Sequence, residues 1–238
     1  MLSQSLQIQI DAEIELRQRR EHGDFGLIAP AHWREWLREL FPAYVSAPFS
    51  DRHVEFWEWV DSIELGMRPD PFCGFWPRGG AKSTSAELAA SFVGAKGTRK
   101  YIWYVGGTQD KADSHVDSIA GLLENTQLEK YYPDLASRAI GKYGNSKGWR
   151  RSRLRSQSGF TVDALGLDTS ARGMKDEEQR PDMIIFDDVD ELHDSFATTQ
   201  KKIETITKSI LPSGSNGDCA VLFIQNLIHP ESIASQLA

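Results

Sequence analysis

The sequence predicts an α/β fold in which helices flank a mostly parallel sheet, with a small N-terminal helical segment in front. From residue 71 onward, short apolar runs alternate with helical segments, as they do in sheets built from strand–helix crossovers. Several runs are apolar at every position. That pattern is typical of strands in a sheet that is covered on both faces.

The expected elements follow in order along the chain. Helices are expected first at 4–22, 31–41 and 51–65, and Ser50 is the predicted N-cap of the third helix. Strands are then expected at 71–76, 101–105, 160–165, 183–187 and 219–224. Further helices are expected at 82–95, 109–124, 195–210 and 230–237. We assign residues 1–48 to the N-terminal helical segment and linker, and residues 49–238 to the main domain.

The bulk composition excludes several classes of protein. The chain has 238 residues, 40% of them hydrophobic, and a formal net charge of −7, so it is not a generally basic nucleic-acid binder. No apolar run approaches the ~20 residues of a membrane span, and we expect no membrane association. The two cysteines, Cys73 and Cys219, lie in predicted buried strands, and we expect small core residues in a reducing compartment.

The most informative stretch is Phe75-Trp-Pro-Arg-Gly-Gly-Ala-Lys-Ser-Thr84, an apolar strand followed by a Gly-rich turn and a helix start. These are the parts of a phosphate-binding loop, or Walker A motif, in which backbone N–H groups and a lysine bind phosphates and a hydroxyl binds Mg²⁺. Ala81 stands where the common motif has its last glycine, and Trp76 where it has its first. The predicted nucleotide-binding residues are Arg78, Gly79, Gly80, Ala81, Lys82, Ser83 and Thr84, with Ser83 as a Mg²⁺ ligand.

The second motif, Met183-Ile-Ile-Phe-Asp-Asp188, is an apolar run that ends in two carboxylates, as in a Walker B motif. Ligands bind at the carboxyl ends of parallel strands, so these acids are expected beside the phosphate loop. We predict that Asp187 binds the metal and that Asp188 orients or deprotonates water, with Glu191 as the alternative catalytic acid. The two motifs together predict a P-loop NTPase of the RecA/ASCE-like type, with ATP and Mg²⁺ as cofactors.

Other candidate residues surround these motifs. Arg78 precedes the glycines and could stabilise charge on the γ-phosphate in cis. Arg172, next to Gly173, is suited to reach a neighbouring subunit's nucleotide, although pairing with Asp176 or Glu177 is almost as good an interpretation.

Two stretches remain. The amides of Gln225 and Asn226 end an apolar strand and are candidates for coupling, although a turn-forming Asn is the simpler interpretation. A local basic stretch is the best candidate for contacts with DNA phosphates, with a solvated hairpin as an equal alternative. Its predicted DNA-binding residues are Lys147, Arg150, Arg151, Arg153 and Arg155.

With these motifs, the chain resembles the ATPase domain of the large terminase subunit of tailed bacteriophages. Four stretches carry the resemblance, in the family's order: residues 77–84, the Tyr101–Asp110 strand and Thr-Gln turn, the Arg-Gly loop leading into the acidic strand, and residues 223–232. Asp188 departs from the pattern, because many members have Glu there.

The resemblance implies a DNA-packaging motor that couples ATP hydrolysis to movement of double-stranded DNA into a procapsid in the host cytoplasm. It implies a homo-oligomeric ring that works with a portal and a small terminase subunit, with Arg172 as a trans-acting finger. It also implies a nucleotide-binding role for His53, whose helix resembles the segment leading to the adenine pocket. The family's C-terminal nuclease domain is expected to be missing from this chain, so we expect no DNA cleavage.

Two alternatives remain open at the level of sequence. A helicase-like DNA-dependent ATPase would share both phosphate motifs, but it would need a second RecA-like domain. A nucleotide-binding assembly module would bind ATP and show little turnover even when concentrated.

Overall fold

The computed structural model describes residues 29–142, 144, 146–168, 179–191, 193–226 and 230–237. The predicted helix at 4–22 and the candidate finger Arg172 lie outside this part of the chain. Among the helices that the structure describes, none combines the length and the hydropathy needed to cross a membrane.

The centre of the fold is a six-stranded sheet in the order β1-β6-β5-β2-β4-β3. All neighbours run parallel except β3, which pairs antiparallel with β4 at one edge. The predicted α/β class with a mostly parallel sheet is confirmed. The strands are β1 (Phe72–Phe75), β2 (Tyr101–Gly106), β3 (Arg153–Arg155), β4 (Thr161–Gly166), β5 (Met183–Asp187) and β6 (Ala220–Gln225).

The register brings the carboxyl ends of the strands level with one another. Gly106 lies beside Asp187, Asp187 beside Ile224, and Phe75 beside Gln225. The segments that follow β1, β2, β5 and β6 therefore leave the sheet at one edge, which is where parallel sheets bind their ligands.

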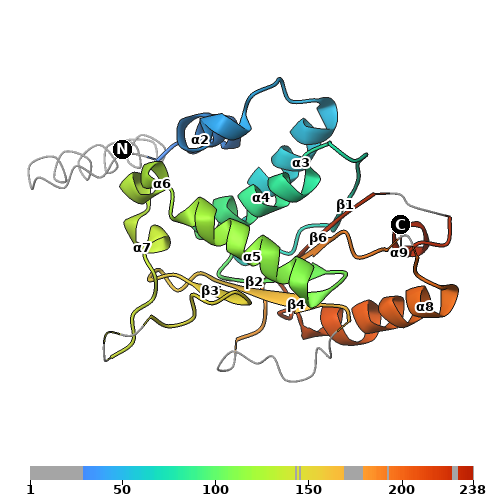
Figure 1. Ribbon diagram of the computed structural model, residues 1–238. Helices are drawn as coiled ribbons and strands as arrows, with labels where there is room; N and C mark the ends of the chain where they lie inside the picture. The colour runs from blue at the N-terminus through green and yellow to red at the C-terminus, as the bar shows by residue number, and fades with distance from the viewer. Residues whose placement is uncertain are drawn as a thin grey trace, which may run out of the picture.

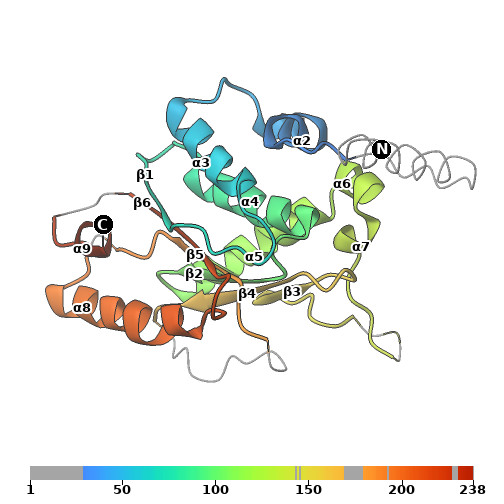
Figure 2. The same cartoon turned by 180° about the vertical axis from the view of Figure 1, so that it is seen from behind.

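Helices cover both faces of the sheet, and Figures 1 and 2 show the three layers from opposite sides. One face carries α3 (Asp51–Asp61), α4 (Lys82–Lys96) and α5 (Gln109–Leu123); the other carries α8 (Phe196–Thr205), which continues into a π-helical turn at Ile206–Ile210, and α9 (Ile233–Leu237). The remaining helices are α2 (Trp33–Leu40), α6 (Thr126–Tyr131) and α7 (Pro133–Ala136), with 3-10 turns at Pro42–Tyr44 and Leu211–Ser213.

The N-terminal helix α2 is part of the main core. Trp33 and Trp36 are both buried, Trp33 stacks on Trp57 of α3 at 5.8 Å, and Trp36 meets Phe92 of α4 edge-on at 5.1 Å. Burial of aromatic rings of this size contributes strongly to the hydrophobic stabilisation of the fold. Residues 33–41, which the sequence analysis assigned to a separate N-terminal segment, therefore pack against the sheet domain.

The structure also corrects details of the sequence prediction. The apolar pattern did not reveal β3, α6 or α7, which are short. Cys219 is buried as expected, but the prediction that Cys73 is a core residue is wrong, because Cys73 is exposed. Cys73 lies in β1, the other edge strand, and lines a groove with Leu211 and Gly217.

Two helical glycines provide a matched test of this packing. A Cβ on Gly94 of α4 would lie 2.8 Å from the Phe160 ring, whereas a Cβ on Gly121 of α5 would meet nothing within 4 Å. We expect Gly94→Ala to lower the free energy of unfolding by about 1–3 kcal/mol through overpacking. Gly121→Ala should raise it by about 0.5–1 kcal/mol through helix propensity. Urea denaturation of both variants measures these changes, and a stabilised Gly94→Ala protein would contradict the α4–Phe160 contact.

Candidate nucleotide-binding and catalytic site

The Gly-rich turn connects β1 to α4 with two residues in left-handed conformations. Gly79 has φ +81°, which glycine adopts without strain, and Ala81 has φ 55° and ψ 27° immediately before the helix starts at Lys82. For an alanine this conformation costs roughly 1 kcal/mol, which explains why the common motif has glycine at this position. The backbone thus has the sharp turn into a helix N-terminus that phosphate loops need.

His53 of α3 forms a hydrogen bond to the phosphate loop. The Ser50 N–H donates to His53 Nδ1 at 3.3 Å, so Nε2 carries the proton that is donated to the Gly80 carbonyl oxygen at 3.0 Å. The same ring meets Trp76 edge-on at 4.9 Å. His53 also lines a cavity of about 290 Å³ with Phe49, Trp57 and Thr84. The predicted nucleotide-binding role of His53 remains a prediction, and the structure places the residue against the phosphate loop.

Asp187, at the end of β5, is a buried carboxylate with one oxygen held and one without a partner. The Tyr104 hydroxyl donates to Oδ2 at 2.8 Å, and His115 Nε2 lies 3.5 Å from the same atom. Oδ1 is buried and has no hydrogen-bond partner among the described residues. Burial raises the pKa of Asp187, and His115, Ser83 and Tyr104 act in the opposite direction.

This arrangement fits a divalent cation. The orphaned Asp187 oxygen and the nearby Ser83 hydroxyl are hard oxygen donors of the kind that Mg²⁺ prefers. In the part of the chain that the structure describes, no group of three or more His, Cys, Asp or Glu side chains could hold a metal by itself. Mg²⁺ in phosphate-transfer sites usually has few protein ligands and completes its shell with water and substrate phosphates, so Asp187 and Ser83 are a suitable set.

His115 and Glu87, which were not predicted from the sequence, form a bonded pair next to Asp187. His115 of α5 is bonded to Glu87 of α4, with Nδ1 2.7 Å from Oε1, and it stacks on the Tyr104 ring at 4.8 Å. Burial lowers the pKa of His115, but the Glu87 hydrogen bond and the charge of Asp187 outweigh it, and the net shift is upward. These contacts fix the orientation of Asp187 in the way that outer-layer partners orient metal ligands.

Asp188 connects the acidic strand to the phosphate loop. It has a left-handed φ of 45°, and its carboxylate Oδ2 accepts from Lys82 Nζ at 3.1 Å. The Lys82 side chain is only 9% exposed, whereas that of Asp188 is 38% exposed. The lysine expected to bind phosphates and the acid expected to act on water are therefore in direct contact.

Several predicted residues from separate segments meet around one cavity of about 210 Å³. Glu191 lies there with its Oε1 2.9 Å from Lys111 Nζ. Lys111, Asp190 and His193 were not predicted from the sequence. The cavity is lined by Arg78, Lys111, Asp188, Asp190, Glu191, His193 and Asn226.

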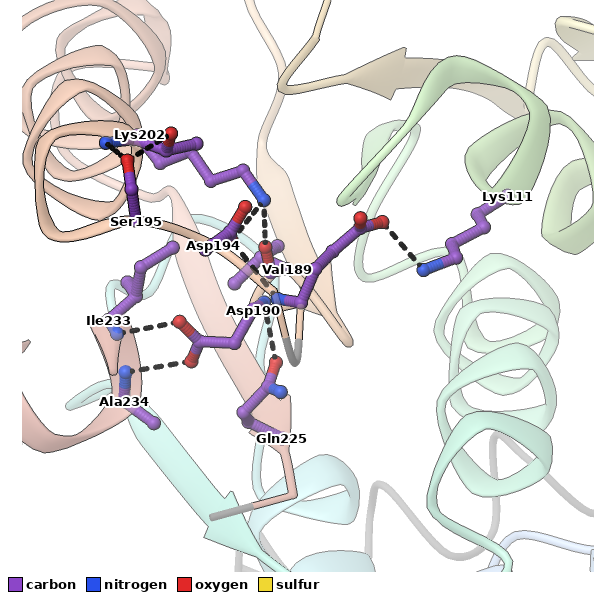
Figure 3. A network of polar contacts seen from close by, with 11 residues as sticks. Lys111, Val189, Asp190, Asp194, Ser195, Lys202, Gln225, Ile233 and Ala234 are labelled. Atoms are coloured by element: carbon purple, nitrogen blue, oxygen red, sulfur yellow. Dashed lines mark hydrogen bonds and ion pairs between the residues drawn. The ribbon is translucent and has the colours of Figure 1, made fainter. Parts of the chain in front are cut away.

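Figure 3 shows how the acidic loop is anchored. The buried Asp190 carboxylate accepts from the backbone N–H groups of Ile233 and Ala234, at 2.7 and 3.1 Å, and so caps α9. Lys202 of α8 donates to the Val189 carbonyl at 3.0 Å and to Asp194 at 2.7 Å. The loop after β5 is thereby bonded to both helices on the second face of the sheet.

Gln225 is bonded to both functional loops. Its side-chain oxygen accepts from the Asp190 N–H at 3.4 Å, and its backbone oxygen accepts from the Trp76 N–H at 3.2 Å. It is completely buried. This placement suits the predicted coupling role of Gln225, while Asn226 lies at the cavity itself.

The predicted DNA-binding residues differ in their surroundings. Arg153 forms two hydrogen bonds to the buried Asp163 carboxylate, at 2.5 and 2.6 Å, and Tyr101 donates to the same carboxylate at 2.6 Å. Arg151 pairs with Asp110 of α5 at 3.2 Å. Lys147 and Arg150 are exposed, and Arg155 is half-buried.

A phosphate loop after one strand and an acid pair after another, both at the carboxyl edge of a helix-covered parallel sheet, define a P-loop NTPase fold. Among solved structures, the chain is similar to a point mutant of the ATPase domain of the large terminase of Thermus phage P74-26. The TM-score is 0.50 and the identity 15%, with 80% of this chain and 68% of that chain covered. The domain without the mutation gives a TM-score of 0.49 at the same identity and coverage. No family model and no curated protein sequence matches the chain.

The similarity shows the fold: this chain has the fold of a phage large terminase ATPase domain. The fold that the sequence resemblance implied is confirmed. At this identity the activity and the partners remain proposals.

The contrast between two arginines of the basic stretch is testable. Arg153→Ala should lower the free energy of unfolding by about 2–4 kcal/mol, because it leaves the Asp163 carboxylate, 1% exposed, without its guanidinium. Arg150→Ala, at an exposed position, should change it by less than about 0.5 kcal/mol. Chemical denaturation gives both values, and equal stabilities would show that the Arg153–Asp163 pair contributes nothing to folding.

Proposed function

We propose that this chain is the ATPase of a viral DNA-packaging motor, hydrolysing ATP to move double-stranded DNA into a procapsid. The observation that carries the proposal is the Lys82–Asp188 contact, which joins the phosphate loop to the acidic strand beside a cavity lined by Arg78 and Glu191. The fold shared with a large terminase ATPase domain supports the motor assignment.

In this proposal each residue has one task. The amides of residues 79–82 and the Lys82 ammonium bind the phosphates, and His53 keeps the loop in place. Asp187 and Ser83 would hold Mg²⁺, which would neutralise negative charge on the phosphates. Lys82 exchanges Asp188 for phosphate, and the Asp188 carboxylate then orients the attacking water and accepts its proton. Arg78 stabilises the charge that develops on the γ-phosphoryl group.

The assembly belongs to the same proposal. A ring of copies on a portal, acting in the host cytoplasm with a small terminase subunit and double-stranded DNA, would place Arg172 of one copy at the nucleotide of its neighbour. Lys147, Arg150 and Arg151 are exposed, and Arg151 pairs with Asp110. Lys147 and Arg150 are therefore our first candidates for contacts with DNA phosphates.

Substitutions in the two motifs test the ATPase assignment. Lys82→Ala should abolish nucleotide binding or turnover, since it removes the phosphate-binding cation. Asp188→Asn should keep binding and lower kcat by at least about a hundredfold, the usual contribution of general-base catalysis. Mg²⁺-dependent phosphate release and equilibrium ATP binding measure both. Full hydrolysis by Lys82→Ala protein would refute the phosphate loop, and a loss of turnover in Glu191→Gln but not Asp188→Asn would transfer the catalytic role to Glu191.

The role of a neighbouring subunit has its own test. If Arg172 acts in trans, specific ATPase activity should rise with protein concentration, and Arg172→Ala protein should regain activity when it is mixed with Lys82→Ala protein. A mixed interface is intact where the Arg172→Ala copy supplies the nucleotide site and the Lys82→Ala copy supplies the finger, whereas the reverse interface lacks both. Activity that is substantial and independent of concentration would favour Arg78 acting in cis. ATP binding with no turnover at any concentration, with or without DNA, would support the assembly-module alternative.

A further inference from the structure

Lys111 is a cation at the catalytic cavity with no role in the proposal so far. It lies in the first turn of α5, which follows β2 at the carboxyl edge of the sheet, and its backbone N–H donates to the capping Thr108 hydroxyl at 3.4 Å. Its ammonium is 2.9 Å from Glu191 Oε1, a contact that Figure 3 shows from close by. The position of Lys111 is therefore set by a helix cap as well as by its ion pair.

The Lys111–Glu191 ion pair is exposed and weak enough for each side chain to exchange its partner. The two side chains are 50% and 37% exposed, and ion pairs at such positions contribute little, roughly 0.2–1 kcal/mol. The acids that anchor the loop are held differently, because Asp190 is buried and accepts two backbone N–H groups. Glu191 can change its partner without disturbing the fold.

The cavity brings Lys111 together with groups that would meet a terminal phosphate. Arg78, Asp188 and Asn226 line it from the phosphate loop, the acidic strand and the end of β6. Lys82 and Lys111 each hold one of the two candidate catalytic acids, at 3.1 and 2.9 Å. A terminal phosphate group, which bears more than one negative charge, is a stronger partner for an ammonium than a half-exposed carboxylate.

We propose that Lys111 binds the γ-phosphate by leaving Glu191, and that this exchange makes the site prefer a triphosphate to a diphosphate. The inference rests on the proposed function and deepens it. ATP then releases two acids at once, Asp188 from Lys82 and Glu191 from Lys111. ADP releases only the first, because its β-phosphate engages Lys82 and leaves Lys111 on Glu191.

The test compares the binding of Mg²⁺–ADP and of a Mg²⁺–non-hydrolysable ATP analogue by isothermal titration calorimetry. Lys111→Met should weaken the analogue by about tenfold, as expected for loss of a charge-assisted hydrogen bond, and change ADP affinity by less than about twofold. Lys111→Arg should retain most of the preference. Glu191→Gln should tighten analogue binding by roughly two- to fivefold, since it removes the competing partner of Lys111.

Lys208→Met is the matched control, because Lys208 forms an exposed 2.8 Å ion pair with Glu204 outside the cavity. It should leave both affinities unchanged. An equal loss for both nucleotides in Lys111→Met, or no loss, would overturn the exchange. So would weaker analogue binding in Glu191→Gln. If the wild-type protein binds neither nucleotide, both the proposed function and this inference fail. If it binds both nucleotides and only the Lys111 variants depart from expectation, the inference alone fails.

Discussion

The position of β6 between β1 and β5 is the constraint on which the whole site depends. It puts one buried residue, Gln225, within hydrogen-bonding distance of both the phosphate-loop strand and the acidic loop. A displacement of either loop must therefore be accommodated at Gln225. The Lys82–Asp188 contact closes the same connection through side chains, between residues 106 positions apart in the sequence. When Lys82 exchanges Asp188 for phosphate, as we propose, the Gln225 contacts can still join the two loops.

The acids of the loop after β5 divide by burial into two kinds. Asp187 and Asp190 are almost fully buried, at 1% and 3% exposure. Tyr104 and His115 hold one oxygen of Asp187, and two amides of α9 hold both oxygens of Asp190. Breaking contacts of this kind leaves a buried charge uncompensated, at a cost of several kcal/mol. The side chains of Asp188 and Glu191 are more than a third exposed, and each carboxylate pairs with a lysine, Lys82 or Lys111. The buried acids can thus keep the loop in shape while the exposed acids change partners during turnover.

The sequence predicted the parts of this arrangement that depend on local pattern. Apolar runs predicted the strands from β1 to β6 apart from β3, which is too short to show a period, and motif spacing predicted Asp187, Asp188 and Lys82. Cys73 was misplaced because an apolar run does not reveal which strand lies at the edge. Lys111, His115 and Asp190 were missed for another reason: their significance comes from partners far along the chain, such as Glu191, 80 positions from Lys111. Only the fold brings those partners together.

The same geometry bears on which acid acts on water. Asp188 touches Lys82, the cation that we propose binds the phosphates, so in that proposal its carboxylate lies next to them. Glu191 lies against a different cation, Lys111, with its Oε1 2.9 Å from Nζ. Asp188 has a left-handed φ of 45°, and its carboxylate accepts from Lys82 of the phosphate loop at 3.1 Å. In the proposed hydrolysis, this direct contact with the phosphate loop favours Asp188 over Glu191 as the acid that acts on water.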